Sequence, residues 1–172
     1  GWVLLGLLVV AGGTAVFLGN RWVGQSADAL LYPRRTQPSQ TPAEFGLAAE
    51  TVRIPADAIE LAAWDIHPTE AVSGATLIYV HGFGGNRAAL LEQVAAMHEV
   101  GYGALLLDMR NHGESGDAIS TWGPAEARDV IAAYNYLLAR SEVDSGRIGL
   151  VGKSMGGAAV TLAAAQLPDL AV

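Results

Sequence analysis

The sequence contains no cysteine and a single lysine, Lys153, and its ten basic residues are spread along the chain. The lack of cysteine excludes disulfides, thiolate metal sites and cysteine nucleophiles. Nucleic-acid binding is not expected, because the formal net charge is −7 and no cluster of Lys and Arg is present. The histidines show no i,i+4 pair and no HExxH arrangement, so no metal site and no other cofactor is expected.

Residues 1–20 carry no charge at all and are mostly apolar, and this run ends at Arg21. A helix of about 20 apolar residues spans a bilayer core, with about 17 as the lower limit. We therefore predict a single transmembrane anchor over 1–20. Two alternatives remain open: a cleaved signal peptide with an A-x-A-like site at 27–29, which would make the protein secreted or periplasmic, and a buried core helix. The side of the membrane that the rest of the chain faces is left open.

Residues 21–46 are predicted to be a linker, because the stretch 32–46 holds three of the seven prolines and many polar residues. Residues 47–172 are predicted to form the folded core. Within it, two β-like runs at 50–54 and 59–66 flank Pro55-Ala56-Asp57-Ala58, which predicts a β-hairpin.

The remainder of the core alternates between two kinds of apolar pattern. Continuous apolar runs, typical of strands buried on both faces, occupy residues 75–80, 103–108 and 147–151. Helical patterns follow these runs at residues 87–100, 124–138 and 154–166. This order predicts an α/β fold of right-handed βαβ units, with a mostly parallel sheet and helices on both of its faces.

Three polar, glycine-containing loops follow the carboxyl ends of the three predicted parallel strands. Their sequences are HGFGGN at 81–86, DMRNHGES at 108–115 and GKSMGG at 152–157. In open α/β sheets the ligand crevice lies at the carboxyl edge of the strands. We therefore expect the three loops to build one site.

The third loop contains Gly-x-Ser-x-Gly between a predicted strand and a predicted helix, which is the pattern of a nucleophile elbow. The serine, Ser154, must sit on a strained turn, and Gly152 and Gly156 leave room for that turn. The following helix directs its positive N-terminus toward the site, which favours a developing oxyanion. Ser154 is therefore the candidate nucleophile.

Backbone N–H groups of the first loop and of the residue after the nucleophile form the oxyanion hole in such sites. Here these donors are Phe83 and Met155. Glycines such as Gly82 permit the unusual backbone geometry of the first loop. His81 is interpreted as a residue that supports the loop by hydrogen bonding.

The second loop is predicted to be structural. Asp108 is expected to pair with Arg110 and so hold the loop, while His112 is kept as an alternative catalytic base.

Two rival nucleotide-binding motifs are excluded by the spacing of their glycines. A Walker A loop needs a glycine where Arg147 stands, and a dinucleotide-binding fingerprint needs one where Arg87 stands.

The three motifs, in this order and spacing, resemble the α/β-hydrolase superfamily. Within it the chain is similar to the serine aminopeptidase and lysophospholipase-like group, which includes membrane-anchored bacterial members. The resemblance covers Phe45 to Val172. It implies a serine hydrolase that acts on an ester, thioester or amide through an acyl-enzyme, with a small-molecule, lipid or acyl substrate. Together with the predicted anchor, it implies a single-pass protein of the bacterial inner membrane.

The resemblance also implies a Ser-Asp-His triad in chain order. No histidine follows Ser154, and the only acidic residue after it is Asp169, which is too early for the acid of the family. We therefore expect a fragment of an α/β-hydrolase fold, incomplete at its C-terminus and inactive alone, with the Asp and His of the triad beyond Val172. The alternative is a non-catalytic, membrane-tethered binding protein. The oligomeric state is left open.

Overall fold

The computed structural model describes residues 2–69, 74–167 and 170, with side chains from residue 12 onward. The chain divides into two compact units, Gly1–Tyr32 and Pro33–Val172. The first unit is one helix, α1 (Trp2–Leu31). Over the described residues, no helix is both long enough and apolar enough to cross a membrane.

Helix α1 extends well past residue 20, into the stretch that was predicted to be a linker. The physical reason is that residues 21–31 contain no proline, and the chain meets its first proline at Pro33. The residue before a proline is disfavoured in helical conformation, so the helix ends there. A short 3-10 helix, η1 (Pro42–Phe45), follows before the core begins.

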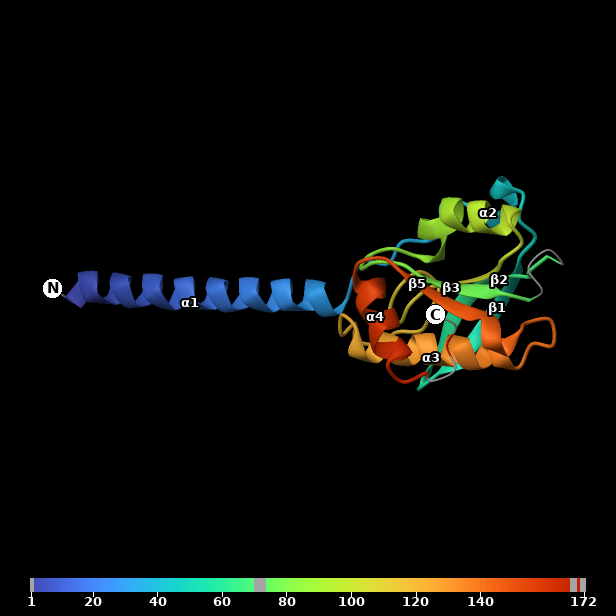
Figure 1. The fold of residues 1–172 in the computed structure, drawn as a ribbon. Helices are drawn as coiled ribbons and strands as arrows, with labels where there is room; N and C mark the ends of the chain where they lie inside the picture. The colour runs from blue at the N-terminus through green and yellow to red at the C-terminus, as the bar shows by residue number, and fades with distance from the viewer. Residues whose placement is uncertain (1, 70–73, 168–169, 171–172) are drawn as a thin grey trace. The chain divides into compact units, whose positions relative to one another are not determined.

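The second unit is built on a five-stranded sheet (Figure 1). Its strands are β1 (Glu50–Ala56), β2 (Ile59–Ile66), β3 (Thr76–Val80), β4 (Gly103–Leu107) and β5 (Ile148–Gly152). The strand order is β1-β2-β4-β3-β5. The predicted hairpin is confirmed as the antiparallel pair of β1 and β2.

The sheet is mixed, which corrects the expectation of a mostly parallel sheet. Strand β3 pairs in parallel with both β4 and β5, but β2 pairs antiparallel with β4 as well as with β1. The reason is that the hairpin adds to the sheet through β2, beside β4. The apolar patterns show that these segments are strands, but they do not show which neighbour each strand joins.

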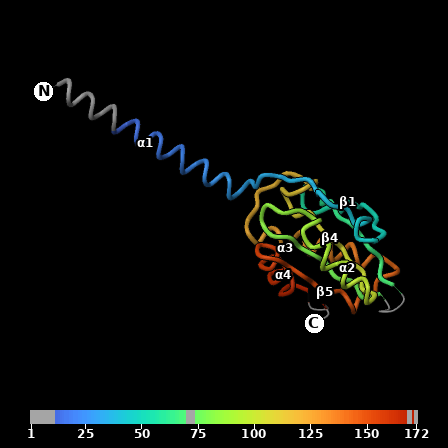
Figure 2. Tube along the Cα trace, turned by 90° about the horizontal axis from the view of Figure 1, so that it is seen from above, coloured from blue at the N-terminus to red at the C-terminus, as the bar shows by residue number. Residues whose placement is uncertain are grey.

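Helices cover both faces of the sheet, as predicted (Figure 1). A 3-10 turn, η3 (Arg87–Leu90), leads into α2 (Leu91–Glu99) on one face. On the other face α3 (Pro124–Leu138) and α4 (Met155–Ala164) lie side by side in both views (Figures 1 and 2). A core of buried apolar side chains lies under each layer of helices.

The strand register aligns the carboxyl ends of the three parallel strands. Val80 at the end of β3 is paired with Leu107 of β4 and with Gly152 of β5. The three polar loops therefore leave the sheet at the same edge, as the ligand crevice of an α/β sheet requires. This edge carries the candidate active site.

Candidate active site

Ser154 lies at the turn between β5 and α4 and has a backbone conformation with positive φ, with φ 55° and ψ −119°. A residue with a Cβ rarely adopts this conformation, and such strain collects at functional sites. The turn is held from both sides. Lys153 donates its N–H to the carbonyl of Val80 on β3 at 3.0 Å, and Gly156 donates to the carbonyl of Lys153 at 2.9 Å.

The glycines on either side of Ser154 have no room for a side chain. A Cβ on Gly156 would lie 2.3 Å from the carbonyl oxygen of Val80. A Cβ on Gly152 would lie 2.4 Å from the carbonyl oxygen of Gly156. Both contacts are far inside van der Waals distance and involve backbone atoms, so only glycine at these positions lets α4 start so close to β3 and β5.

The first loop lies directly against the serine, since a Cβ on Gly82 would be 3.3 Å from the Cβ of Ser154. The structure thus brings together the loop of Phe83 and the start of α4 at Met155. Neither of these two N–H groups donates to any other group that the structure describes. Met155 is the first residue of its helix, so its N–H has no intrahelical acceptor.

His81 and His112 link the first and second loops. The ring nitrogen Nε2 of His81 accepts the N–H of Met109 at 3.1 Å, and that of His112 accepts the N–H of Gly84 at 3.0 Å. The Nδ1 atoms contact the carbonyls of Gly82 (2.7 Å) and Arg110 (2.8 Å). The two rings lie 5.0 Å apart.

Burial sets the charge state of both rings. Burial lowers the pKa of His81 to about 4, and burial also lowers the pKa of His112. Both rings are therefore neutral at pH 7. His112, which was kept as an alternative base, has both ring nitrogens engaged and none left to take a proton from Ser154.

The other two described histidines lie away from Ser154. His67 and His98 line a cleft at the other edge of the sheet, where the parallel strands begin. The carboxylate that follows the nucleophile in the sequence, Asp169, falls outside the described residues. Within the part of the chain that the structure describes, no histidine is placed to act as base for Ser154.

The expected pairing of Asp108 with Arg110 is wrong. Asp108 accepts from the backbone N–H of Arg87 at 2.6 Å and forms an ion pair with the Arg87 guanidinium at 2.5 Å. The guanidinium of Arg110 instead binds Asp129 of α3, with Nη2 2.7 Å from Oδ1. The reason is geometric: the side chains of the two loop residues face different elements, Asp108 toward η3 and Arg110 toward α3.

Glu126 and Trp122 are two further residues of this edge that the sequence reasoning missed. The carboxylate of Glu126 accepts the N–H groups of Thr121 and Gly123, each at 2.8 Å. Burial alone would raise the pKa of Glu126, but these N–H donors hold it below the ordinary value. The signal was present in the sequence, because a Glu two residues after a helix-opening Pro can accept the N–H of the N-cap residue, as the Glu of a capping box does.

An open cleft of about 360 Å³ adjoins the nucleophile. Its lining includes Ser154, Lys153, Gly82 and Gly85, together with two aromatic side chains. The rings of Phe83 and Trp122 stack with their centroids 4.4 Å apart and their planes 17° from parallel. The wall of the cleft beside Ser154 is therefore apolar and aromatic.

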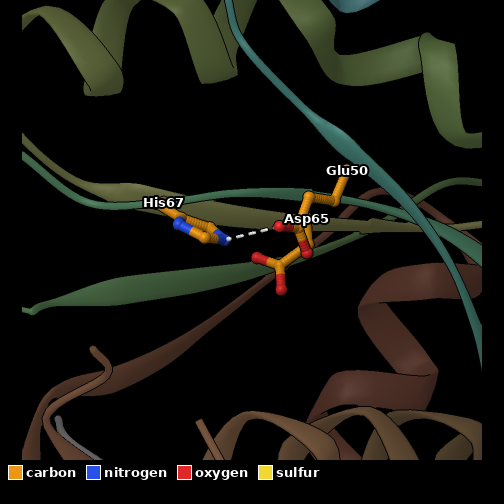
Figure 3. A group of neighbouring side chains, drawn as sticks. All are labelled: Glu50, Asp65 and His67. Carbon is orange, nitrogen blue, oxygen red and sulfur yellow. Dashed lines mark ion pairs between the residues drawn. The ribbon is translucent and has the colours of Figure 1, made fainter. Parts of the chain in front are cut away.

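One group of side chains in the described residues has the composition of a metal site: Glu50, Asp65 and His67 (Figure 3). Their possible ligand atoms lie within 4.8 Å of one another. Arg140 already supplies a cation to this group, since its guanidinium lies 3.2 Å from a carboxylate oxygen of Glu50 and 2.9 Å from Nε2 of His67. Asp65 is also hydrogen-bonded, to the hydroxyl of Tyr136 at 2.9 Å. We therefore interpret the group as an ion-pair network.

Comparison with known proteins identifies the family of the fold. The family model described as "alpha/beta hydrolase fold" matches residues 75–171, more than half of the chain. The chain belongs to the alpha/beta hydrolase family. The family match agrees with the mixed sheet and the flanking helices of the second unit.

Among the relatives is an uncharacterized protein of Mycobacterium tuberculosis, 33% identical over 116 residues, which are 67% of this chain and 41% of the relative. The alpha/beta hydrolase domain-containing protein WAV2 of Arabidopsis thaliana is 30% identical over 131 residues, 75% of this chain and 42% of the relative. The chain spans about two fifths of the length of these curated relatives.

Among solved structures, the Pyrococcus furiosus esterase Pf2001 superposes with a TM-score of 0.73 and 27% identity, over 80% of this chain and 55% of the esterase. The structure of Est1E from Butyrivibrio proteoclasticus with bound ferulic acid gives a TM-score of 0.62 and 27% identity. That match covers 70% of this chain and 49% of Est1E.

Proposed function

We propose that the protein is a serine hydrolase that cleaves an ester, thioester or amide through an acyl-enzyme on Ser154. The observation that carries the proposal is the strained turn at Ser154, which stands beside two backbone N–H groups without acceptors, those of Phe83 and Met155. Strain and unpaired donors each cost stability. Their occurrence together at the carboxyl edge of the sheet favours a reactive serine.

The chemistry follows from these groups. The Oγ of Ser154 attacks the carbonyl carbon of the substrate, and its proton passes to a histidine base. The carbonyl oxygen becomes an oxyanion that accepts from the N–H groups of Phe83 and Met155. Collapse of the intermediate expels the protonated alcohol, thiol or amine, and water then hydrolyses the acyl-enzyme by the same route.

The base and its acid partner are proposed to lie beyond Val172. All four histidines of the chain precede Ser154, and in the structure two are engaged in loop support while the other two line the opposite edge. The chain also spans only about two fifths of its curated relatives. An Asp and then a His in the continuing sequence would complete the triad.

The decisive experiment is labelling of the complete protein with a fluorophosphonate, which reacts with activated serines. We expect wild-type protein to be labelled and Ser154→Ala to remain unlabelled. Ser145→Ala is the matched control, because Ser145 is exposed in the turn before β5 and should leave labelling unchanged. Equal labelling of wild type and Ser154→Ala would refute the assignment of the nucleophile.

A non-catalytic binding protein that retains the fold is the second candidate. Such a protein would have the same glycine-rich turn and cleft. It would form no covalent adduct with any activated ester, even as the complete protein. Intact-protein mass spectrometry after incubation with a p-nitrophenyl ester separates the two candidates. An acyl adduct that is lost in Ser154→Ala supports the hydrolase, and no adduct on wild-type protein supports the binding protein.

For the substrate we propose an apolar acyl group. The aromatic wall formed by Phe83 and Trp122 beside Ser154 supports this, since it offers apolar surface to the group carried on the carbonyl. The likeness to the Pyrococcus furiosus esterase supports an ester as the substrate class. Rates on p-nitrophenyl esters of increasing acyl length test the idea, and equal rates on acetyl and octanoyl esters would contradict it.

Membrane attachment through residues 1–20 is also a proposal, and it rests on the absence of charge in that segment. Fractionation of cells that express the complete protein, with and without these residues, provides the test. Recovery of both forms in the soluble fraction would count against attachment. Loss of the segment from the mature protein would support the signal-peptide alternative.

A further inference from the structure

The loop that carries Phe83 is a tight turn that several backbone hydrogen bonds hold in place. Gly85 donates its N–H to the carbonyl of Gly82 at 3.0 Å, which closes the turn, and Gly84 adopts φ 73°. The carbonyl of Gly82 also contacts Nδ1 of His81 at 2.7 Å. The N–H of Gly84 donates to Nε2 of His112 at 3.0 Å. Among the hydrogen bonds of the described residues, the N–H of Phe83 is directed to no protein acceptor.

These contacts define the tautomer of both rings. A backbone N–H donates to Nε2 in each ring, so Nε2 must carry a lone pair and no proton. The proton of each neutral ring is then on Nδ1, which faces a carbonyl oxygen in both cases. His81 and His112 therefore have the same arrangement, and each ring connects the first loop to the second.

We propose that His112, supported by His81, is a positioning residue that holds the Gly82–Gly85 turn with the N–H of Phe83 free for the oxyanion. This inference rests on the proposed function of Ser154. Neither ring touches the reacting atoms; each acts through the backbone of the turn. The ring of Phe83 also packs edge-on against His112, with centroids 5.7 Å apart, so the same histidine orients both the peptide and the side chain of that residue.

The surroundings of His112 keep it neutral. It is fully buried, and the charged groups that act on it are Glu126, Asp108 and Arg35, with the neutral ring of His81 beside it. The two carboxylates favour the protonated ring, while burial and Arg35 oppose it. A protonated ring would present N–H to the N–H of Gly84 and break the contact that holds the turn.

The test compares two substitutions at His112 in the complete protein. In His112→Gln the side-chain oxygen reaches the position of Nε2 and still accepts from Gly84, whereas His112→Leu fills similar space without an acceptor. Removal of an oxyanion donor lowers kcat by about 100- to 1,000-fold. Misplacement of one should cost about 10- to 100-fold in kcat for a p-nitrophenyl ester, with KM within about twofold.

We expect this loss in His112→Leu and recovery of most of the rate in His112→Gln. Melting temperatures check that both variants are folded at the assay temperature. Unchanged kcat in folded His112→Leu would overturn the proposal, as would a glutamine variant as slow as the leucine variant. The rate of fluorophosphonate labelling should follow kcat across the same set.

A second measurement uses wild-type protein and needs no substitution. The ¹⁵N resonances of the histidine rings report the tautomer directly, and we expect Nδ1–H in both His81 and His112 at pH 7. Nε2–H in His112 would overturn the proposal, because that ring could not accept from Gly84. If wild-type protein is never labelled, the proposed function itself fails; labelling of wild type with normal kinetics in His112→Leu refutes the positioning role alone.

Discussion

The adjacent glycines Gly156 and Gly157, both in the first turn of α4, permit a sharp test of the structure. An alanine is favoured over glycine in a helix by about 1 kcal/mol. At Gly157 the nearest atom to a new Cβ is 3.5 Å away, which is an ordinary contact. We therefore expect Gly157→Ala to stabilise the protein by about 0.5–1 kcal/mol.

At Gly156 the same change meets the backbone of β3. The new Cβ would lie 2.3 Å from the carbonyl oxygen of Val80, so α4 must move away from the strand by about 1 Å. Overpacking of this kind costs about 1–3 kcal/mol, and rigid backbone on both sides places Gly156→Ala at the upper end. After the helical gain, a net loss of about 2 kcal/mol remains, which separates the two variants by about 3 kcal/mol.

Urea unfolding followed by tryptophan fluorescence measures this difference, which exceeds the usual extrapolation error. The displacement of α4 also moves Ser154 and Met155, so fluorophosphonate labelling should fall in Gly156→Ala and persist in Gly157→Ala. Equal stability of the two variants would refute the close approach of α4 to β3 on which the description of the elbow depends.

Two further predictions concern the buried polar groups of the same edge. The pKa of His81 is about 4 in the folded chain against 6.5 in the unfolded chain. As the pH falls, the unfolded chain is therefore protonated at a higher pH than the folded chain. The free energy of unfolding should fall by about 2 kcal/mol between pH 8 and pH 5. Urea midpoints measured across this pH range test the prediction. If His81→Gln loses as much stability as wild type, a group other than His81 causes the loss. Asp129→Asn leaves the buried guanidinium of Arg110 with only the exposed Asp57 as its charge partner, at 3.0 Å, and should cost up to about 3 kcal/mol in urea unfolding. The exposed Arg128 serves as control, since Arg128→Gln should change stability by less than about 1 kcal/mol; similar losses in both variants would contradict the buried pair.

Much of the fold and of the candidate site was determined by local sequence. The apolar runs at 75–80 and 103–108 predicted strands because full burial on both faces demands apolar residues at every position. The turn at Ser154 was predictable for a related reason. Its geometry requires small residues two positions before and after the serine, and that requirement is visible at Gly152 and Gly156 without a structure.

The tertiary structure alone decided the partners of the polar side chains. Arg87 is 21 residues from Asp108, and Arg110 is 19 residues from Asp129. An ion pair can join any two opposite charges that the fold brings together, so sequence proximity wrongly favoured Asp108 with Arg110. The role of His112 could not be predicted for the same reason, because its Nε2 accepts from Gly84 only where the fold brings the second loop against the first.

The sequence by itself therefore determined the elements and the strained serine, since both depend on residues that are neighbours in the chain. Only the tertiary structure decided which strand β2 joins and how the rings of His81 and His112 hold the loop of Phe83 beside Ser154. Both features depend on contacts between segments that are distant in the chain, and no local pattern encodes the partner.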